Sequence, residues 1–282
     1  MFKKLYIEIS NICNLSCSFC HGTRRAPKMM TADEFLQIAK KVQGFSQNYC
    51  LHVLGEPLIH PQLSEILDIC EKYSMPVNIT TNGTLLKDNS AMLLSKPALK
   101  KVSISLHSFE GCGGSDIQNY LCDCVDFAKK CIASEKICVL RLWNLDGAFS
   151  KGENTLNDDI IAMLKADFKD EWKKCFNGYK LKEYLFLEWG EKFEWPDMSA
   201  PDYGERGFCY GLRSQIAILC DGTVVPCCLD SDGNIPLGNI YESELTDILS
   251  SPRAEAINRG FTARKITEPL CRRCGYANRF KK

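Results

Sequence analysis

Along the N-terminal part of this chain, segments in which apolar residues recur at every second position take turns with segments in which they recur at helical intervals. Residues 4–10 alternate with period two and are rich in β-branched side chains, which predicts a strand. Residues 31–42 open with a Thr followed by acidic residues and place Phe35, Ile38 and Val42 at helical intervals, which predicts a capped helix. The same alternation predicts further strands at 49–54, 77–80, 101–106, 137–143 and 184–189, and further helices at 63–73, 87–94, 117–134 and 156–166.

Six strand–helix units in succession predict an α/β fold, a partial (β/α)6 barrel resembling a TIM barrel. Polar and glycine-containing segments recur directly after the strands, at 55–57, 81–83, 107–108 and 144. Active sites of parallel barrels are built at the carboxyl ends of the strands. We therefore expect the site at this end of the barrel.

Charge and hydropathy exclude several other classes of protein. Lys plus Arg and Asp plus Glu both number 35, so no overall basic field attracts nucleic acid or a membrane surface. The N-terminus lacks the apolar core of a signal peptide, and the sequence contains no run of 18 apolar residues. These features predict a cytoplasmic protein without membrane or nucleic-acid partners.

Seventeen cysteines are an odd number in a long chain without an export signal, which favours metal ligation over disulfides. Cys13, Cys17 and Cys20 have the spacing C-x3-C-x2-C, so one loop can hold three corners of an iron–sulfur cubane and leave the fourth iron open. His21 follows directly and is interpreted as a solvated loop residue. Ten cysteines are interpreted mainly as small buried hydrophobic residues, at positions 50, 70, 112, 122, 124, 131, 138, 175, 220 and 228.

A second group of cysteines lies in the C-terminal part. A hairpin predicted at 215–219 and 223–225 would bring Cys209 and Cys227 to one end, and a helix predicted at 244–258 precedes Cys271 and Cys274. Cys220 and Cys228 are alternative ligands. Four such thiolates suit either a structural zinc ion or an iron–sulfur cluster. The expected organisation is a barrel at 1–195, a linker at 196–208 and a cluster domain at 209–282.

With these motifs in order, the chain resembles the radical S-adenosylmethionine (SAM) enzymes. Phe19 precedes the last loop cysteine as in that family, and Leu-Gly-Glu-Pro at 54–57 resembles its Gly-Gly-Glu-Pro motif. The strand ends at 79–83 and 103–107 also resemble the family pattern. The C-terminal cysteines resemble the SPASM extension or its shortened twitch form. The last cysteines of the full SPASM pattern are absent, which suggests one auxiliary [4Fe-4S] cluster.

The resemblance implies that SAM binds the open iron of a [4Fe-4S] cluster and is cleaved by one electron to a 5′-deoxyadenosyl radical. It places Gly55 and Glu56 near the methionyl amino group and Arg141 near the carboxylate, although Arg141 could instead pair with Glu188. A flavodoxin or ferredoxin is the expected reductant. The residues expected to bind the cofactor are Phe19, Gly55, Glu56, Pro57, Thr81, Asn82, Ser105, His107 and Arg141.

A fully ligated auxiliary cluster has no open iron and would relay electrons. The leading hypothesis is therefore radical oxidation of a small polar or peptide substrate, with the auxiliary cluster as electron acceptor. One alternative is a peptide-modifying or epimerising enzyme in which Cys112 returns a hydrogen atom. Another is a non-catalytic interaction protein whose cysteines bind zinc.

Overall fold

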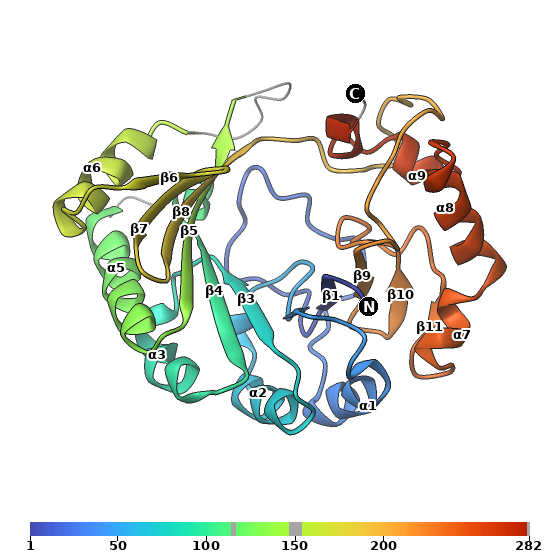
Figure 1. Ribbon diagram of the computed structural model, residues 1–282, viewed down its shortest axis with the longest axis horizontal. Helices are drawn as coiled ribbons and strands as arrows, with labels where there is room; N and C mark the ends of the chain where they lie inside the picture. Colours follow the sequence, from blue (N-terminus) through green and yellow to red (C-terminus); the bar gives the residue numbers. More distant parts are fainter. Residues whose placement is uncertain (114–116, 147–153, 281–282) are drawn as a thin grey trace.

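The strands of this protein form one continuous curved sheet (Figure 1). The computed structural model describes residues 1–113, 117–146 and 154–280, and in these the strand order is β11-β10-β9-β1-β2-β3-β4-β5-β8-β7-β6. Six neighbouring strands, one from each predicted unit, run parallel and form the open barrel, so the predicted fold is confirmed. They are β1 (Lys4–Ile7), β2 (Tyr49–Cys50), β3 (Val77–Thr81), β4 (Leu99–Ser105), β5 (Ile137–Leu145) and β8 (Leu185–Glu191).

Helices cover the outer face of the barrel strands (Figure 1). The first begins with a capping box, in which Thr31 accepts from the amide of Glu34 and the Glu34 side chain accepts from that of Thr31. Its apolar face, with Phe35 and Ile38, is fully buried. The helices are α1 (Ala32–Val42), η1 (Pro57–Ile59), α2 (Leu63–Lys72), α3 (Leu86–Ser95), α4 (His107–Gly111), α5 (Ile117–Ala133) and α6 (Asn157–Asp167).

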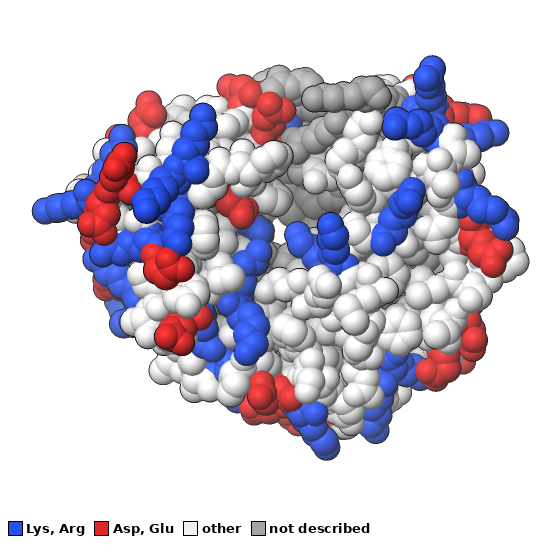
Figure 2. Space-filling view, viewed as in Figure 1, with Lys and Arg blue, Asp and Glu red and all other residues white. Residues whose placement is uncertain are grey.

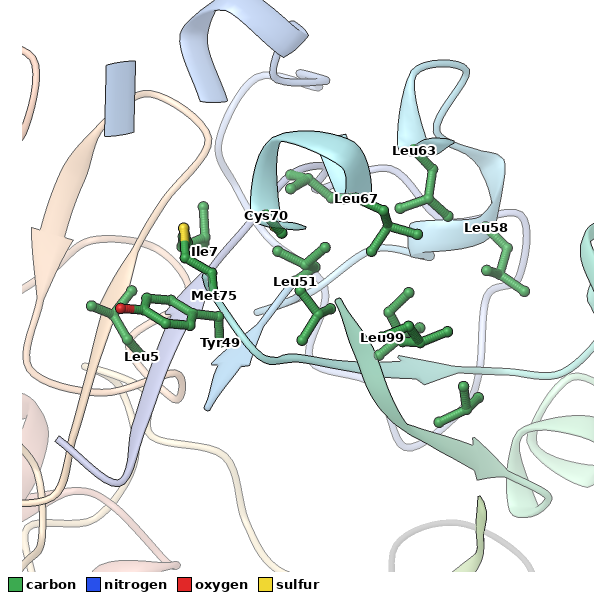
Figure 3. Close-up of a cluster of buried hydrophobic side chains, with 14 of the residues drawn as sticks. Leu5, Ile7, Tyr49, Leu51, Leu58, Leu63, Leu67, Cys70, Met75 and Leu99 are labelled. Atoms are coloured by element: carbon green, nitrogen blue, oxygen red, sulfur yellow. The ribbon is translucent and has the colours of Figure 1, made fainter. Parts of the chain in front are cut away.

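The main hydrophobic core lies between the strands and these helices, and Figure 3 shows part of it. Leu5 and Ile7 of β1 are fully buried there with Leu67 and Cys70 of α2. Each fully buried aliphatic side chain stabilises the fold by ~1.5–3 kcal/mol. Because side chains alternate along a strand, the other face of each barrel strand points inward. That inner face carries many polar residues, which leaves it available for a site.

A second hairpin, not predicted from the sequence, extends the sheet beyond β8. Strands β6 (Lys173–Cys175) and β7 (Gly178–Lys182) pair antiparallel, and β7 pairs antiparallel with β8. The segment is rich in Lys, and β6 is largely exposed, so the segment lacks the apolar alternation of a barrel strand. The Asn177-Gly178 pair at its turn was the available signal.

The C-terminal part continues the same sheet. The predicted hairpin is confirmed as β9 (Gln215–Ile218) and β10 (Thr223–Val225), and β9 pairs parallel with β1. The prediction of one continuous helix at 244–258 is wrong. The structure has two helices there, α7 (Leu245–Leu249) and α8 (Pro252–Thr262). Pro252 has no amide to continue α7 and starts α8 behind a Ser251 cap.

The remaining elements are β11 (Gly238–Asn239), α9 (Pro269–Arg272) and η2 (Ala277–Phe280). The helices within the described ranges include none that is long and apolar enough to cross a membrane.

Candidate cluster and cofactor sites

The three N-terminal cysteines lie in the loop that follows β1, and all three line one cavity of about 440 Å³. Asn11 connects the two ends of this loop. Its Nδ2 donates to the Ala26 carbonyl (2.9 Å), and its Oδ1 accepts from the Lys28 amide (2.7 Å). The first and third thiols are exposed and the second is half-buried. The loop therefore presents three sulfurs to a shared space.

The surroundings of Cys13 and Cys17 favour the protonated form of these two thiols in the absence of metal. Burial raises the pKa of the Cys13 thiol, although the Leu15 amide lies 3.4 Å from its sulfur and opposes the shift. Burial also raises the pKa of the Cys17 thiol, and the hydrogen bond with the Cys112 thiol raises it further. Metal binding would release these protons. Donors to a ligand sulfur, such as Leu15, also influence the potential of a bound cluster.

The Gly55-Glu56 segment lies directly against the cluster loop. Gly55 has φ +74°, and a Cβ atom there would collide with the carbonyl oxygens of Ser10 and Ile12. The next amide, that of Glu56, donates to the same Ile12 carbonyl (2.9 Å). Only glycine allows this close approach of two backbones. The approach places the segment after β2 in the wall of the cavity.

Glu56 holds the ends of two elements together. Its carboxylate is 2% exposed and accepts from the amides of Leu58 (3.0 Å) and Asn82 (2.7 Å). Burial raises the pKa of this carboxyl, and the two amides oppose the shift. Both oxygens thus already have a backbone partner, so Glu56 positions the end of β3 in addition to lining the cavity.

Thr81, Asn82 and Ser105 line the same cavity from the ends of β3 and β4. The side-chain Nδ2 of Asn82 donates to Asn14 Oδ1 (2.9 Å) and lies 3.8 Å from the sulfur of Cys13. Its backbone carbonyl accepts from the Tyr120 hydroxyl (2.7 Å). Asn82 therefore connects the end of β3 to the first cluster cysteine.

Phe19 lines the cavity, whereas His107 lies behind it. Their ring centroids are 5.0 Å apart, and a Cβ at Gly111 would come within 2.5 Å of the Phe19 ring. Burial lowers the pKa of His107 to about 4, so the imidazole is neutral, with Nδ1 3.2 Å from the Arg141 carbonyl. The structure places His107 as a support for Phe19.

Arg141 and Pro57 are not among the residues that line the cavity. Arg141 Nη1 donates to Thr80 Oγ1 (3.2 Å), and its Nε lies 3.7 Å from Glu188 Oε2, the ion pair that the sequence left open. Pro57 is buried at the first position of η1. Neither side chain forms part of the cavity wall.

His52 and Trp195 are among the cavity-lining residues that were not predicted as cofactor ligands. His52 has a buried Nδ1 with no hydrogen-bond partner among the described residues, and burial lowers its pKa to about 3. It follows β2 on the face of Cys50, so strand alternation was the available signal. Trp195 also lines the cavity and stacks on His21 with centroids 6.1 Å apart.

The four C-terminal cysteines line one narrow pocket. Burial raises the pKa of Cys227 strongly, and the charges of nearby thiolates raise it further, first that of its chain neighbour Cys228 and then those of Cys209, Cys271 and Cys274. Such mutual effects require that the sulfurs lie close together. The four come from three segments: one lies before β9, one after β10, and two in the C-x2-C segment at the end of α9. They are Cys209, Cys227, Cys271 and Cys274.

The two alternative ligands point elsewhere. Cys220 donates to Glu8 Oε2 (3.1 Å), and Cys228 packs with Tyr6 and Cys50 on the inner face of the barrel. Neither lines the pocket of the four cysteines. The structure thus separates Cys227 from its neighbour Cys228, as the sequence prediction preferred.

A buried ion pair links the first cluster loop to the C-terminal part. Arg25 Nη2 donates to both carboxylate oxygens of Glu8 (2.7 Å each), and its Nε donates to the Ser231 carbonyl (2.7 Å). Nearby, Thr23 donates to Asp232 (2.7 Å). Glu8 is fully buried, so Arg25 is its required counter-ion.

The donor sets suit iron–sulfur clusters chemically. One loop offers three thiols beside a cavity, and the second pocket offers four thiols from three segments. No three His, Cys, Asp or Glu side chains in the described part of the chain are close enough together to ligate a single metal ion. A cubane, by contrast, spreads its ligands over four irons.

Comparison with known proteins supports the same assignment. The chain matches the family model of the radical SAM superfamily over residues 7–111 and that of SPASM, an iron-sulfur cluster-binding domain, over residues 209–275. A probable GTP 3′,8-cyclase of Thermoplasma volcanium is 32% identical over 109 residues, which are 38% of this chain and 33% of that protein. The match thus spans about one third of that relative's length.

Two solved structures share the fold over nearly the whole chain. BtrN in complex with AdoMet and 2-DOIA is 15% identical with a TM-score of 0.57, and the match covers 97% of this chain and 93% of BtrN. Streptococcus suis SuiB bound to the precursor peptide SuiA is 16% identical with a TM-score of 0.61, covering 100% and 73%. The chain belongs to the radical SAM superfamily and carries a C-terminal SPASM iron–sulfur domain.

Proposed function

We propose that this enzyme carries out a two-electron oxidation of a small polar or peptide-borne substrate, with an auxiliary [4Fe-4S] cluster as the electron acceptor. One observation carries the proposal: Cys209, Cys227, Cys271 and Cys274 all line the same pocket. Four thiolates complete the ligand shell of a cubane and leave no iron for substrate. Electron transfer is then the role that remains for this cluster.

Cys13, Cys17 and Cys20 would hold the first cluster, beside the cavity in which SAM would bind. When bound, the first cluster and SAM would supply the chemistry for hydrogen abstraction from the substrate. The second cluster would accept the further electron that the substrate radical must lose. The protein orients the cofactor through the wall at Gly55 and Asn82. Burial of this wall also keeps water from the reacting atoms.

The two sites share one sheet, which supports electron transfer between them. β1 leads into the first cluster loop, and it pairs with β9 of the C-terminal hairpin. The Arg25–Ser231 hydrogen bond adds a direct connection between the loops. This arrangement fixes the relative position of the two cysteine sets.

The epimerising alternative needs a thiol that reaches substrate. Cys112, the expected hydrogen donor, contacts Cys17 and is not among the residues lining the cavity. This placement favours oxidation over hydrogen return.

The test is turnover in deuterated water. Reconstituted enzyme with SAM and a reductant is incubated anaerobically with a small-molecule extract and, separately, with a peptide pool, and products are identified by mass spectrometry. We expect a product lighter than its substrate by two hydrogens and without solvent deuterium. A product of unchanged composition that carries one deuterium contradicts the proposal and indicates epimerisation.

A matched pair of variants tests the auxiliary cluster in this assay. Cys271→Ser removes one ligand of the second cluster and should abolish the oxidised product while cleavage of SAM continues. Cys228→Ser changes a cysteine adjacent to Cys227 that packs against Tyr6, outside the pocket, and should retain product formation. Equal loss in both variants contradicts the assignment.

A further inference from the structure

The inner face of the barrel is polar below the cavity wall. On β4, Lys101, Ser103 and Ser105 alternate with Val102 and Ile104, which lie in the core against the helices. The residues of the first set therefore point into the barrel. Ser105 lines the cavity beside the cluster cysteines, and Ser103 lies one inward-facing position deeper.

The side chain of Arg141 crosses this face. Arg141 on β5 pairs in register with Ser105 on β4, while its Nη1 reaches Thr80 on β3, which pairs in register with Ser103. To span from β5 to β3, the guanidinium passes over β4. It therefore lies over the inner face that carries Ser103 and Ser105.

Two buried polar atoms of residues on this face have no hydrogen-bond partner among the described residues. They are the hydroxyl oxygen of Ser103, which is 1% exposed, and Nε of Arg141. The Glu188 carboxylate lies 3.7 Å from Nε, which is an ion-pair distance and too long for a hydrogen bond. Buried donors of this kind are costly to leave unpaired, so the pair indicates a place for a ligand oxygen.

The charge of this region is positive. Burial lowers the pKa of Lys101, and the charges of Arg141 and Lys4 lower it further, so the three cations lie near one another. Glu188 is the carboxylate that opposes them, while Glu8, directly after β1, is neutralised by Arg25. Figure 2 shows Lys and Arg side chains on both sides of the hollow near the middle of the view. The excess of cations favours an anion.

We propose that Arg141, Ser103 and Lys101 form an oxyanion subsite that binds a carboxylate or phosphate group of the substrate. The inference rests on the proposed function and adds a substrate class to it. It also assigns Arg141 to substrate, in place of the methionyl carboxylate expected from the sequence. Nε of Arg141 and the Ser103 hydroxyl would donate to the oxyanion, and Lys101 would add charge.

The test uses the anaerobically reconstituted holoenzyme and two probes, inorganic phosphate and acetate. The unfolding temperature is followed with each probe at constant ionic strength, with chloride as the reference salt, and separately with SAM. We expect a saturable rise with at least one probe, and the stronger probe identifies a phosphate or a carboxylate as the preferred group. Arg141→Gln should weaken that binding by about tenfold and leave the rise caused by SAM unchanged.

Ser103→Ala and Arg24→Gln complete the test. Ser103→Ala removes the unpartnered hydroxyl without changing charge and should weaken probe binding, which keeps the proposal testable if Arg141→Gln does not fold. Arg24 is a cation whose side chain is 78% exposed, and its variant should bind as the wild type does. The proposal is overturned if both Ser103→Ala and Arg141→Gln bind the probe as tightly as the wild type does. It is also overturned if SAM no longer raises the unfolding temperature of Arg141→Gln.

Discussion

The sulfur of Cys112 lies 3.3 Å from the sulfur of Cys17, although 95 residues separate them in the sequence. The Cys17 sulfur also lies 3.7 Å from the carbonyl oxygen of Ser108, so α4 and Cys112 directly after it lie against this cluster cysteine. In a loaded enzyme, the Cys112 thiol is placed to donate to the Cys17 thiolate. Such hydrogen bonds to ligand sulfurs shift the potential of a cluster.

In the cluster-free protein we expect the same two thiols to form a disulfide. With oxidised glutathione as oxidant, the thiols lose two protons and two electrons, and the oxidant is reduced to two molecules of glutathione. Non-reducing peptide mapping by mass spectrometry should find residues 17 and 112 cross-linked. If Cys17 pairs only with Cys13 or Cys20, this contact does not persist in solution.

Gly55→Ala should destabilise the protein by about 2 kcal/mol or more, because the new Cβ meets the backbone oxygens of Ser10 and Ile12 at a positive φ. Gly204→Ala is the matched control: its φ is +88°, with no atom within 4 Å of the new Cβ. It should cost about 1 kcal/mol. Urea unfolding measures both, and equal losses would show that the close backbone approach is unimportant.

Arg25→Ala should destabilise the protein by about 3–5 kcal/mol, because it leaves the fully buried carboxylate of Glu8 without its counter-ion. Arg24→Ala removes an exposed partner of Asp197 and should cost less than about 1 kcal/mol. Chemical denaturation of both variants provides the comparison. A small effect of Arg25→Ala would mean that the Glu8–Arg25 contact is not maintained.

The buried His107 should make the fold sensitive to acid. Its pKa is about 4 in the fold, against ~6.5 for an unfolded histidine, so its contribution is present above pH ~6.5 and is lost as the pH falls toward 4. Between pH 7 and pH 5 this loss is about 2 kcal/mol. His107→Asn keeps a donor for the Arg141 carbonyl without titrating, so its free energy of unfolding should fall less over that interval. An equal fall in both proteins would contradict the low pKa.

The barrel could be predicted from the sequence because each of its strands has an apolar outer face and all of them except β8 are followed by a helix. The pattern fails where burial is slight: the hairpin around Phe176 carries Lys residues and an exposed aromatic side chain, and only its Asn177-Gly178 turn indicated it. The last long helix is divided at Pro252. The helical spacing of apolar residues over 244–258 continues across this proline and therefore predicted a single helix.

The site was predictable where several residues lie close together in the sequence. The loop thiols and Gly55 fall in short motifs, and the structure places them around one cavity. The positions of Arg141 and Cys112 depend on contacts between distant segments, with Thr80 and Cys17 respectively. Spacing along the chain carries no information about such contacts, so only the three-dimensional arrangement reveals them.

Iron and acid-labile sulfide analysis of anaerobically reconstituted protein tests the central claim most directly. Two cubanes predict about eight iron and eight sulfide per chain in the wild type, about four of each in Cys271→Ser, and no change in Cys228→Ser. The central claim is a first cluster on Cys13, Cys17 and Cys20 and a second, fully ligated cluster on the four C-terminal cysteines. Zinc without sulfide in the wild type, or about eight iron per chain in Cys271→Ser, would contradict it.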